Sequence, residues 1–176
     1  TTNLWVLHHN LGHHQHYLDQ TKDESRWTRD DGTKMGEMEY SLIITITAYY
    51  RGYLVGKKHP EEMRDFLIFS AITFALLGVL VALKPAAALL LFVFPMITGL
   101  FMTAWATYEH HAGLNTDDLY QASSNNTNRW YNLFTGNLGY HTAHHYKGGL
   151  HWSKLPQLHE KIKDNIPKEL IRETWI

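Results

Sequence analysis

Apolar and polar residues are strongly segregated along this chain. Two stretches without any charged residue, 66–83 and 86–107, are separated only by Lys84 and Pro85. As helices they would extend about 27 Å and about 33 Å at 1.5 Å per residue, and the hydrocarbon core of a bilayer is about 30 Å thick. We therefore predict a transmembrane hairpin at 66–107. The alternative is a buried helical hairpin in a soluble protein, but a chain of 176 residues could hardly cover two helices that are apolar on every side.

The polar segments 1–64 and 108–176 lie on the same side of the membrane if the chain crosses it twice. Basic residues are concentrated in these two segments, whereas Lys84 marks the opposite face. Because cytoplasmic loops have an excess of Lys and Arg, we expect both segments on the cytoplasmic side. The basic residues concerned are Arg51, Lys57, Lys58, Arg64, Arg129, Lys147 and Lys154.

A third apolar stretch, Ser41 to Gly56, is rich in tyrosine and predicts a helix that lies along the membrane surface. Alternation over Ile43 to Thr47 also allows a short strand, which we rank lower. The expected fold is therefore all-α: an integral membrane helical protein with a transmembrane hairpin and a cytosolic helical cap. The length fits a single domain over residues 1–176.

Composition excludes several functional classes. The chain has 16 Lys plus Arg against 17 Asp plus Glu, a net charge of -1, so we expect no nucleic-acid partner. It contains no cysteine, which excludes disulfides, thiolate metal ligands and iron–sulfur clusters. Histidine is the outlier, with 13 residues that fall mostly into three clusters at 8–16, 110–111 and 141–145.

The spacing and number of the histidines indicate metal binding. On an α-helix, His141, His144 and His145 lie within an arc of about 100°. In the first cluster, α-helical periodicity favours a set on one face: His9, His13 and His16. Even without three histidines that we interpret as structural or surface residues (His59, His151 and His159), ten of the 13 remain, enough for two ions.

Topology brings all three clusters to one membrane surface, so distant segments can contribute to one site. Imidazole suits iron, copper, zinc and nickel, and ligand chemistry alone does not name the metal. A bis-histidine haem would need histidines inside the two apolar stretches, which contain none.

Two motifs resemble those of a known family. His9-Asn-Leu-Gly-His13-His14 precedes the predicted hairpin, and His141-Thr-Ala-His144-His145 follows it. In this order and position, they make the whole chain resemble the integral-membrane di-iron fatty acid desaturase and hydroxylase superfamily, whose members have three histidine boxes. The first box of that superfamily, HxxxH, and the membrane hairpin before it are missing, so we expect that the chain lacks its N-terminal part.

The resemblance points to two branches of the superfamily. The segments 132–141 and 151–156 are similar to those around the last box of acyl-lipid and sphingolipid desaturases. The first motif is instead similar to a box of alkane hydroxylases, and 107–113 aligns without gaps to their NYxEHYG segment. This alignment selects His111 as a ligand, whereas matching the Glu-His pair of that segment would select His110.

The resemblance implies seven iron ligands and favours His14 over His16 in the first cluster, which leaves His110 and His16 as second choices. Nearby acidic residues either hydrogen-bond the outer nitrogens of the ligands or form a solvated polar face. The acidic candidates are Asp19, Asp23, Glu24 and Glu109. The expected ligands are His9, His13, His14, His111, His141, His144 and His145.

The resemblance also implies a reaction. Two iron ions would use O2 to remove hydrogen from an unactivated C–H bond of a fatty acyl or alkyl chain that resides in membrane lipid. We expect a desaturase that introduces a double bond into a long-chain acyl group. The alternatives are a membrane hydroxylase of alkanes or acyl chains and a non-catalytic metal-binding membrane subunit. The sequence has no flavin or nicotinamide motif, so electrons would come from a donor such as a ferredoxin, a rubredoxin or a cytochrome b5.

Overall fold

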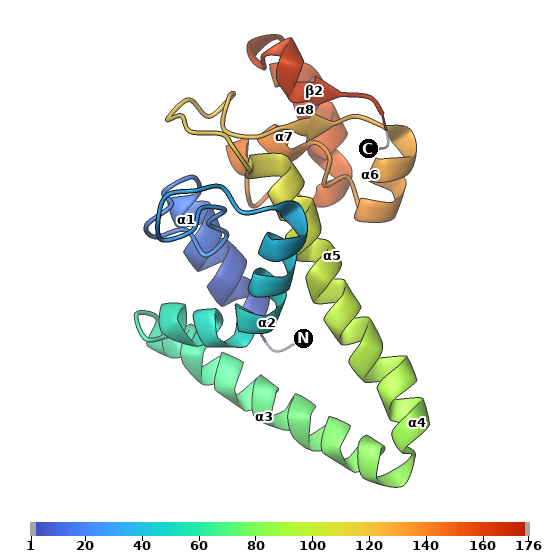
Figure 1. Cartoon of the computed structure of the whole chain (residues 1–176). Helices are drawn as coiled ribbons and strands as arrows, with labels where there is room; N and C mark the ends of the chain where they lie inside the picture. Colours follow the sequence, from blue (N-terminus) through green and yellow to red (C-terminus); the bar gives the residue numbers. More distant parts are fainter. Residues whose placement is uncertain (1–2, 175–176) are drawn as a thin grey trace. The chain divides into compact units, whose positions relative to one another are not determined.

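A computed structural model of the chain describes residues 3–174. The described part is mostly helical, as predicted, and its elements are labelled in Figure 1. The chain divides into two compact units, Thr1–Tyr108 and Glu109–Ile176.

The predicted apolar hairpin forms two long helices. Helix α3 (Pro60–Leu83) has proline at its first position, where the missing N–H costs no hydrogen bond. It ends at Lys84, whose backbone (φ -145°, ψ 72°) is not helical. The second long helix runs from Pro85 to His111 through α4 (Pro85–Ala88), η2 (Leu89–Val93) and α5 (Phe94–His111). The break between the helices therefore lies where the sequence predicted it, and both helices extend beyond the uncharged stretches.

The segment η2 is a π-helical turn inside the second long helix. The N–H of Phe94 bonds to the carbonyl oxygen of Leu89, five residues earlier. Pro95 follows directly and has no N–H to donate, so a wider turn in front of it accommodates the missing hydrogen bond. The helix therefore continues past a proline in its interior.

The side chains of the two long helices are almost all exposed. In the most apolar 18 residues of each helix, only 6% of the residues are buried. Figure 1 shows α3 and α5 diverging from their connection instead of covering each other. Both helices are long and apolar enough to cross a membrane, and the exposure of their described residues does not fit a hairpin buried in a soluble core.

Helix α2 (Glu37–Gly56) confirms the helix predicted over 41–56, so the strand alternative is wrong. It approaches the N-terminal segment closely, because a Cβ atom at Gly52 would lie only 2.4 Å from Cδ1 of Leu4. The N-terminal segment consists of η1 (Val6–His13), a π-helix, and the single turn α1 (His14–His16). The helices η1, α2 and α3, together with Leu4 just before η1, form an apolar core of Leu4, Leu7, Ala48, Val55 and Phe66.

The unit Glu109–Ile176 is built from short elements around a second apolar core. Strands β1 (Asn125–Asn126) and β2 (Ile171–Arg172) pair in parallel, which the all-α prediction did not include, because strands of two residues leave no periodic pattern. The core consists of Ala143, Leu155, Ile162 and Ile166. The helices are α6 (Arg129–Thr135), α7 (His141–Tyr146), η3 (Trp152–Lys154), α8 (Leu155–Ile162), η4 (Lys163–Asn165) and η5 (Lys168–Leu170).

Candidate metal centre

The first histidine motif lies on a π-helix, where hydrogen bonds join residues five apart. In η1 the N–H of His14 bonds to the carbonyl oxygen of His9. Residues five apart are therefore neighbours on one face, and the Nε2 atoms of His9 and His14 are 3.0 Å apart. The α-helical periodicity used on the sequence favoured His16, because it assumed the wrong local period; His16 lies half-buried in α1.

A buried carboxylate orients His13. Its Nδ1 donates to Oδ1 of Asp23 at 2.9 Å, and the two residues are 0% and 5% exposed. The backbone N–H groups of Leu18 and Ser25 donate to the same carboxylate at 3.1 Å and 2.7 Å. With its proton on Nδ1, His13 has a lone pair on Nε2, which is how a carboxylate prepares a histidine to bind a metal.

Asp23 is the one acidic candidate that contacts a histidine among the described residues; the other three bond to basic side chains. Asp19 pairs with Lys22. Glu24 pairs with Arg51 and Glu109 with Arg172. The sequence alone could not show which of these four residues contacts a histidine, because that depends on how the loop after η1 folds back. Gly12 allows that approach, since a Cβ atom there would lie 2.4 Å from Cγ of Glu24.

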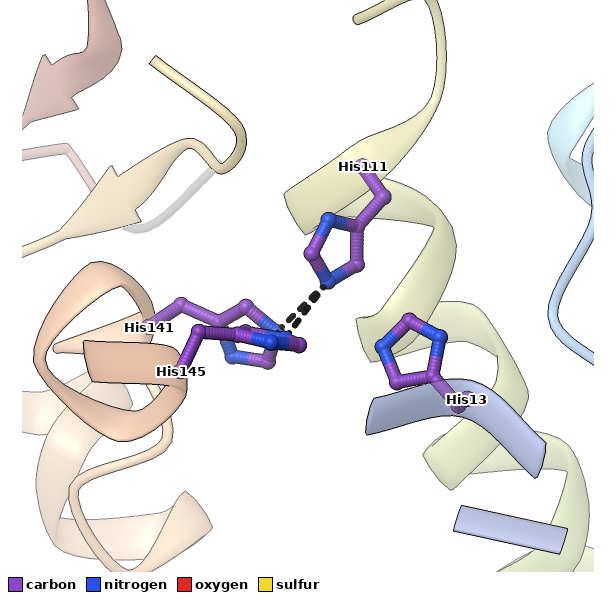
Figure 2. Close-up of side chains that lie close together, drawn as sticks. All are labelled: His13, His111, His141 and His145. Atoms are coloured by element: carbon purple, nitrogen blue, oxygen red, sulfur yellow. Dashed lines mark hydrogen bonds between the residues drawn. The ribbon is translucent and has the colours of Figure 1, made fainter. Parts of the chain in front are cut away.

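Three histidines of the unit Glu109–Ile176 point their Nε2 atoms at one another, as Figure 2 shows. The Nε2 atoms of His111 and His141 are 2.9 Å apart, and those of His111 and His145 are 3.0 Å apart. The third separation, between His141 and His145, is 3.2 Å. His141 and His145 share a face of α7 because they are four residues apart, and His111 is the last residue of α5.

Backbone carbonyl groups determine the tautomer of two of these rings. Nδ1 of His111 donates to the carbonyl oxygen of Ala122 at 3.0 Å, and Nδ1 of His141 donates to that of Leu138 at 3.3 Å. A neutral imidazole with its proton on Nδ1 has a lone pair and no hydrogen on Nε2. The two Nε2 atoms therefore cannot bond to each other, and their lone pairs repel unless a cation binds both.

These separations fit a shared metal ion. Imidazole nitrogens bind zinc and similar divalent metals at about 2.1 Å, so two such ligands at right angles are about 3.0 Å apart. Burial, followed by the neighbouring rings of His110 and His111, holds the pKa of His141 well below its ordinary value. The ring is therefore neutral, as a metal ligand must be. His111, His141 and His145 together form a candidate metal site.

His110 is engaged at both ring nitrogens. Nδ1 donates to the carbonyl oxygen of Ser124 at 2.7 Å, and the hydroxyl of Tyr131 lies 3.2 Å from Nε2, to which it can donate. The ring stacks on His141 with centroids 4.1 Å apart. The structure thus places His110 beside the ring of His141 and outside the Nε2 group. The sequence did not predict that Ser124 and Tyr131 contact His110, because contacts of this kind leave no motif.

His144 lies on α7 next to the same group. Its ring centroid is 5.6 Å from those of both His141 and His145. It follows His141 by three residues and faces a neighbouring sector of the helix. The last motif therefore presents two converging rings and one that is offset.

A comparison with known protein families gives this arrangement its context. The family model described as Fatty acid desaturase matches residues 1–176, the whole chain. The chain belongs to the fatty acid desaturase family. No curated protein and no solved structure matches it. The family is generally one of oxidoreductases and is known for its use of iron, which agrees with the imidazole donor set.

In this desaturase-family chain, the three histidines that the sequence analysis interpreted as structural or surface residues lie outside the histidine groups described above. His59 precedes α3 as its N-cap residue. His151 is exposed and accepts the backbone N–H of Ser153 at the start of η3. His159 is 2% exposed and packs against Tyr140, with ring centroids 5.1 Å apart.

The unit Thr1–Tyr108 contains an apolar cavity of about 380 Å³ that His9 helps to line. Three threonines of the lining donate their hydroxyls to carbonyl oxygens of their own helices, at 2.6 Å for Thr45, 2.8 Å for Thr103 and 3.0 Å for Thr107. These hydroxyls are therefore already satisfied. Apolar lining residues include Leu4, Trp5, Ile44, Ala48, Met96 and Leu100, so the cavity suits a hydrocarbon chain.

Proposed function

We propose that this chain is an O2-dependent, membrane-bound di-iron desaturase of long-chain acyl groups. The observation that supports this most is the group of three Nε2 atoms 2.9–3.2 Å apart, from His111, His141 and His145. Membership of the fatty acid desaturase family supports iron as the metal and an acyl chain as the substrate. Hydroxylation of an alkane or acyl chain is the second candidate, favoured by the likeness of His9–His14 and Thr107–Gly113 to alkane hydroxylases.

Seven histidines are proposed as iron ligands, and the family resemblance implies that they serve one pair of ions. Three are already held in the tautomer that offers Nε2, His13 by a carboxylate and His111 and His141 by carbonyl groups. His110 and His16 are assigned outer positions. The proposed ligands are His9, His13, His14, His111, His141, His144 and His145.

Bound iron would supply the O2 chemistry that removes hydrogen from an unactivated C–H bond. Desaturation takes two hydrogens from –CH2–CH2– and, with two electrons and two protons from outside, reduces O2 to two waters. Hydroxylation uses the same electrons and protons but leaves one oxygen atom in the product and the other in water. For the electrons we propose a ferredoxin, a rubredoxin or a cytochrome b5 as donor.

The apolar cavity next to His9 is the proposed place for the reacting chain. We propose that α3 and the helix from Pro85 to His111 cross the membrane and that the histidines lie on its cytoplasmic side. An acyl chain of membrane lipid would then enter the cavity from the hydrocarbon region without passing through water.

Iron content tests the ligand assignment. His141→Ala and His145→Ala should each lower the iron content of protein loaded with Fe(II) under anaerobic conditions and abolish turnover, because each removes one converging Nε2 atom. His151→Ala is the matched control, since this exposed histidine contacts Ser153 and should leave iron content unchanged. Full iron content and full turnover in both ligand variants would refute the assignment.

Product analysis then separates the candidate activities. With an electron donor and an acyl lipid, the wild-type protein should form a product that is lighter by two hydrogens. A product heavier by one oxygen would instead support hydroxylation. Iron binding without any O2 consumption would contradict both and support a non-catalytic metal-binding subunit.

A further inference from the structure

His8 neighbours the proposed ligand His9 but belongs to no ligand set. Like His9, it lines the apolar cavity. Within the described residues 3–174, its hydrogen-bond partner is Arg51, whose guanidinium lies against Nε2 of His8. A polar ring with one defined partner in a mostly apolar wall is a candidate for recognising a polar atom of the substrate.

Arg51 is itself held firmly in place. Its side chain is 16% exposed and bonds to Oε2 of Glu24 at 3.4 Å, while Glu24 is 17% exposed. It also donates to Oγ1 of Thr47 at 3.0 Å and to the carbonyl oxygen of Ile44 at 3.4 Å. The guanidinium therefore cannot turn away from His8 without losing several hydrogen bonds.

The contact with Arg51 determines the tautomer of His8. A guanidinium has N–H donors and no acceptor, so Nε2 of His8 must contribute a lone pair. A neutral ring whose Nε2 has no hydrogen has its hydrogen on Nδ1. His8 is thus an N–H donor at Nδ1 on a residue that lines the cavity.

We propose that Nδ1–H of His8 donates a hydrogen bond to an oxygen atom of the substrate close to the carbon that is oxidised. This inference rests on the proposed function, because His9, the next residue, marks the iron end of the cavity. The substrate class is then a chain with a carbonyl or hydroxyl oxygen near the reacting C–H bond. A plain alkane has no acceptor for this N–H. The buried donor would then have no hydrogen bond, and the alkane would bind less tightly.

Other residues that line the cavity have hydroxyl groups, which are the alternative candidates for this role. Thr45, Thr103 and Thr107 donate to their own helices and are not donors to a ligand. Thr73 and Tyr49 add hydroxyls from α3 and α2. Thr73→Val and Tyr49→Phe remove these hydroxyls while keeping the shape of each side chain.

Ligand binding without turnover tests the role of His8. Purified protein without an electron donor would be titrated with methyl hexadecanoate and with hexadecane, each displacing a bound fluorescent alkane. The wild-type protein should bind the ester about tenfold more tightly, or better, because only the ester offers an acceptor. His8→Phe, which has a ring but no donor, should lose this preference. His8→Gln should keep it, because an amide can accept from Arg51 and still donate.

His59→Phe is the matched control, since it makes the same substitution at the N-cap of α3, outside the cavity lining, and should retain the preference. A melting temperature for each variant shows whether it folds. Equal binding of both ligands by the wild-type protein, or loss of the preference in Thr73→Val or Tyr49→Phe, would overturn the role of His8 whether or not His8→Phe folds. Tighter binding of the ester without O2-dependent turnover would refute the proposed function alone. Turnover with equal binding of the ester and the alkane would refute the role of His8 alone.

Discussion

At the scale of single residues, three histidines of the two groups are held in the tautomer that can bind a metal through Nε2. In each of them, Nδ1 donates a hydrogen bond to an oxygen atom. Nδ1 of His13 bonds to a carboxylate, whereas Nδ1 of His111 and of His141 bonds to backbone carbonyl oxygens. A charged partner makes the imidazole more basic than a neutral partner does. Asp23 should therefore strengthen metal binding through His13 more than either carbonyl group does through its own ring.

Asp23→Asn should lower the affinity for iron about tenfold to a hundredfold. The amide oxygen can still accept from His13, but an NH2 group then faces the backbone N–H of Leu18, and the negative charge is lost. An equilibrium titration with Fe(II) measures the change. Asp19→Asn is the matched control because Asp19 pairs with Lys22 near the surface. Wild-type affinity in Asp23→Asn would contradict the role of this carboxylate.

His159 should make the fold sensitive to acid. It is 2% exposed, and burial lowers its pKa below the ordinary value. Above about pH 6.5 the ring is neutral in both the folded and the unfolded chain and adds no pH dependence. Below that pH the unfolded chain binds a proton that the folded chain excludes, so the free energy of unfolding decreases as the pH falls.

His159→Phe should therefore reduce the fall in melting temperature between about pH 7 and about pH 5. Iron content should stay unchanged, because His159 packs against Tyr140 and is not a proposed ligand. Equal losses of melting temperature in the variant and the wild-type protein would show that His159 contributes no acid sensitivity.

At the scale of elements, the sequence predicted what depends on local signals. Lys84 and Pro85 predicted the break between the long helices, and the apolar run at 41–56 predicted α2. The π-helix η1 was not predicted, because the periodicity argument assumed an α-helix, whereas η1 has hydrogen bonds between residues five apart and packs at Gly12 against Glu24. The family resemblance favoured His14 without a structural reason, and the i, i+5 geometry of η1 supplies one.

Gly12→Ala tests whether that close approach supports the first motif. Its new Cβ atom would lie 2.4 Å from Cγ and 3.0 Å from Cβ of Glu24, so the loop must shift. We expect the free energy of unfolding to decrease by about 1–3 kcal/mol and iron content to fall. Gly78→Ala in α3 is the control, because a Cβ atom there meets nothing within 4 Å. Denaturation in detergent and iron analysis of both variants measure the effects, and equal stabilities would contradict the proposed tight packing.

At the scale of the whole molecule, composition predicted the main division between exposed apolar helices and polar segments. The family match over residues 1–176 agrees with the resemblance found from the histidine motifs. A single domain and the cytoplasmic position of the histidines stay predictions. The side of the membrane on which the histidines lie depends on how the chain is inserted and on the charges outside the apolar helices. The packing of the folded chain does not determine it.

Single cysteines can report the proposed topology, because the chain has no cysteine of its own. Lys84→Cys lies in the connection between the long helices, whereas Lys57→Cys and Lys154→Cys lie in the polar segments; all three lysines are exposed. If each long helix crosses about 30 Å of hydrocarbon, the first position is on the opposite side from the other two. In sealed vesicles with the cytoplasmic side outward, a membrane-impermeant maleimide should label positions 57 and 154 but reach position 84 only after detergent is added. Rapid labelling of all three positions in intact vesicles would show that the hairpin does not span the bilayer.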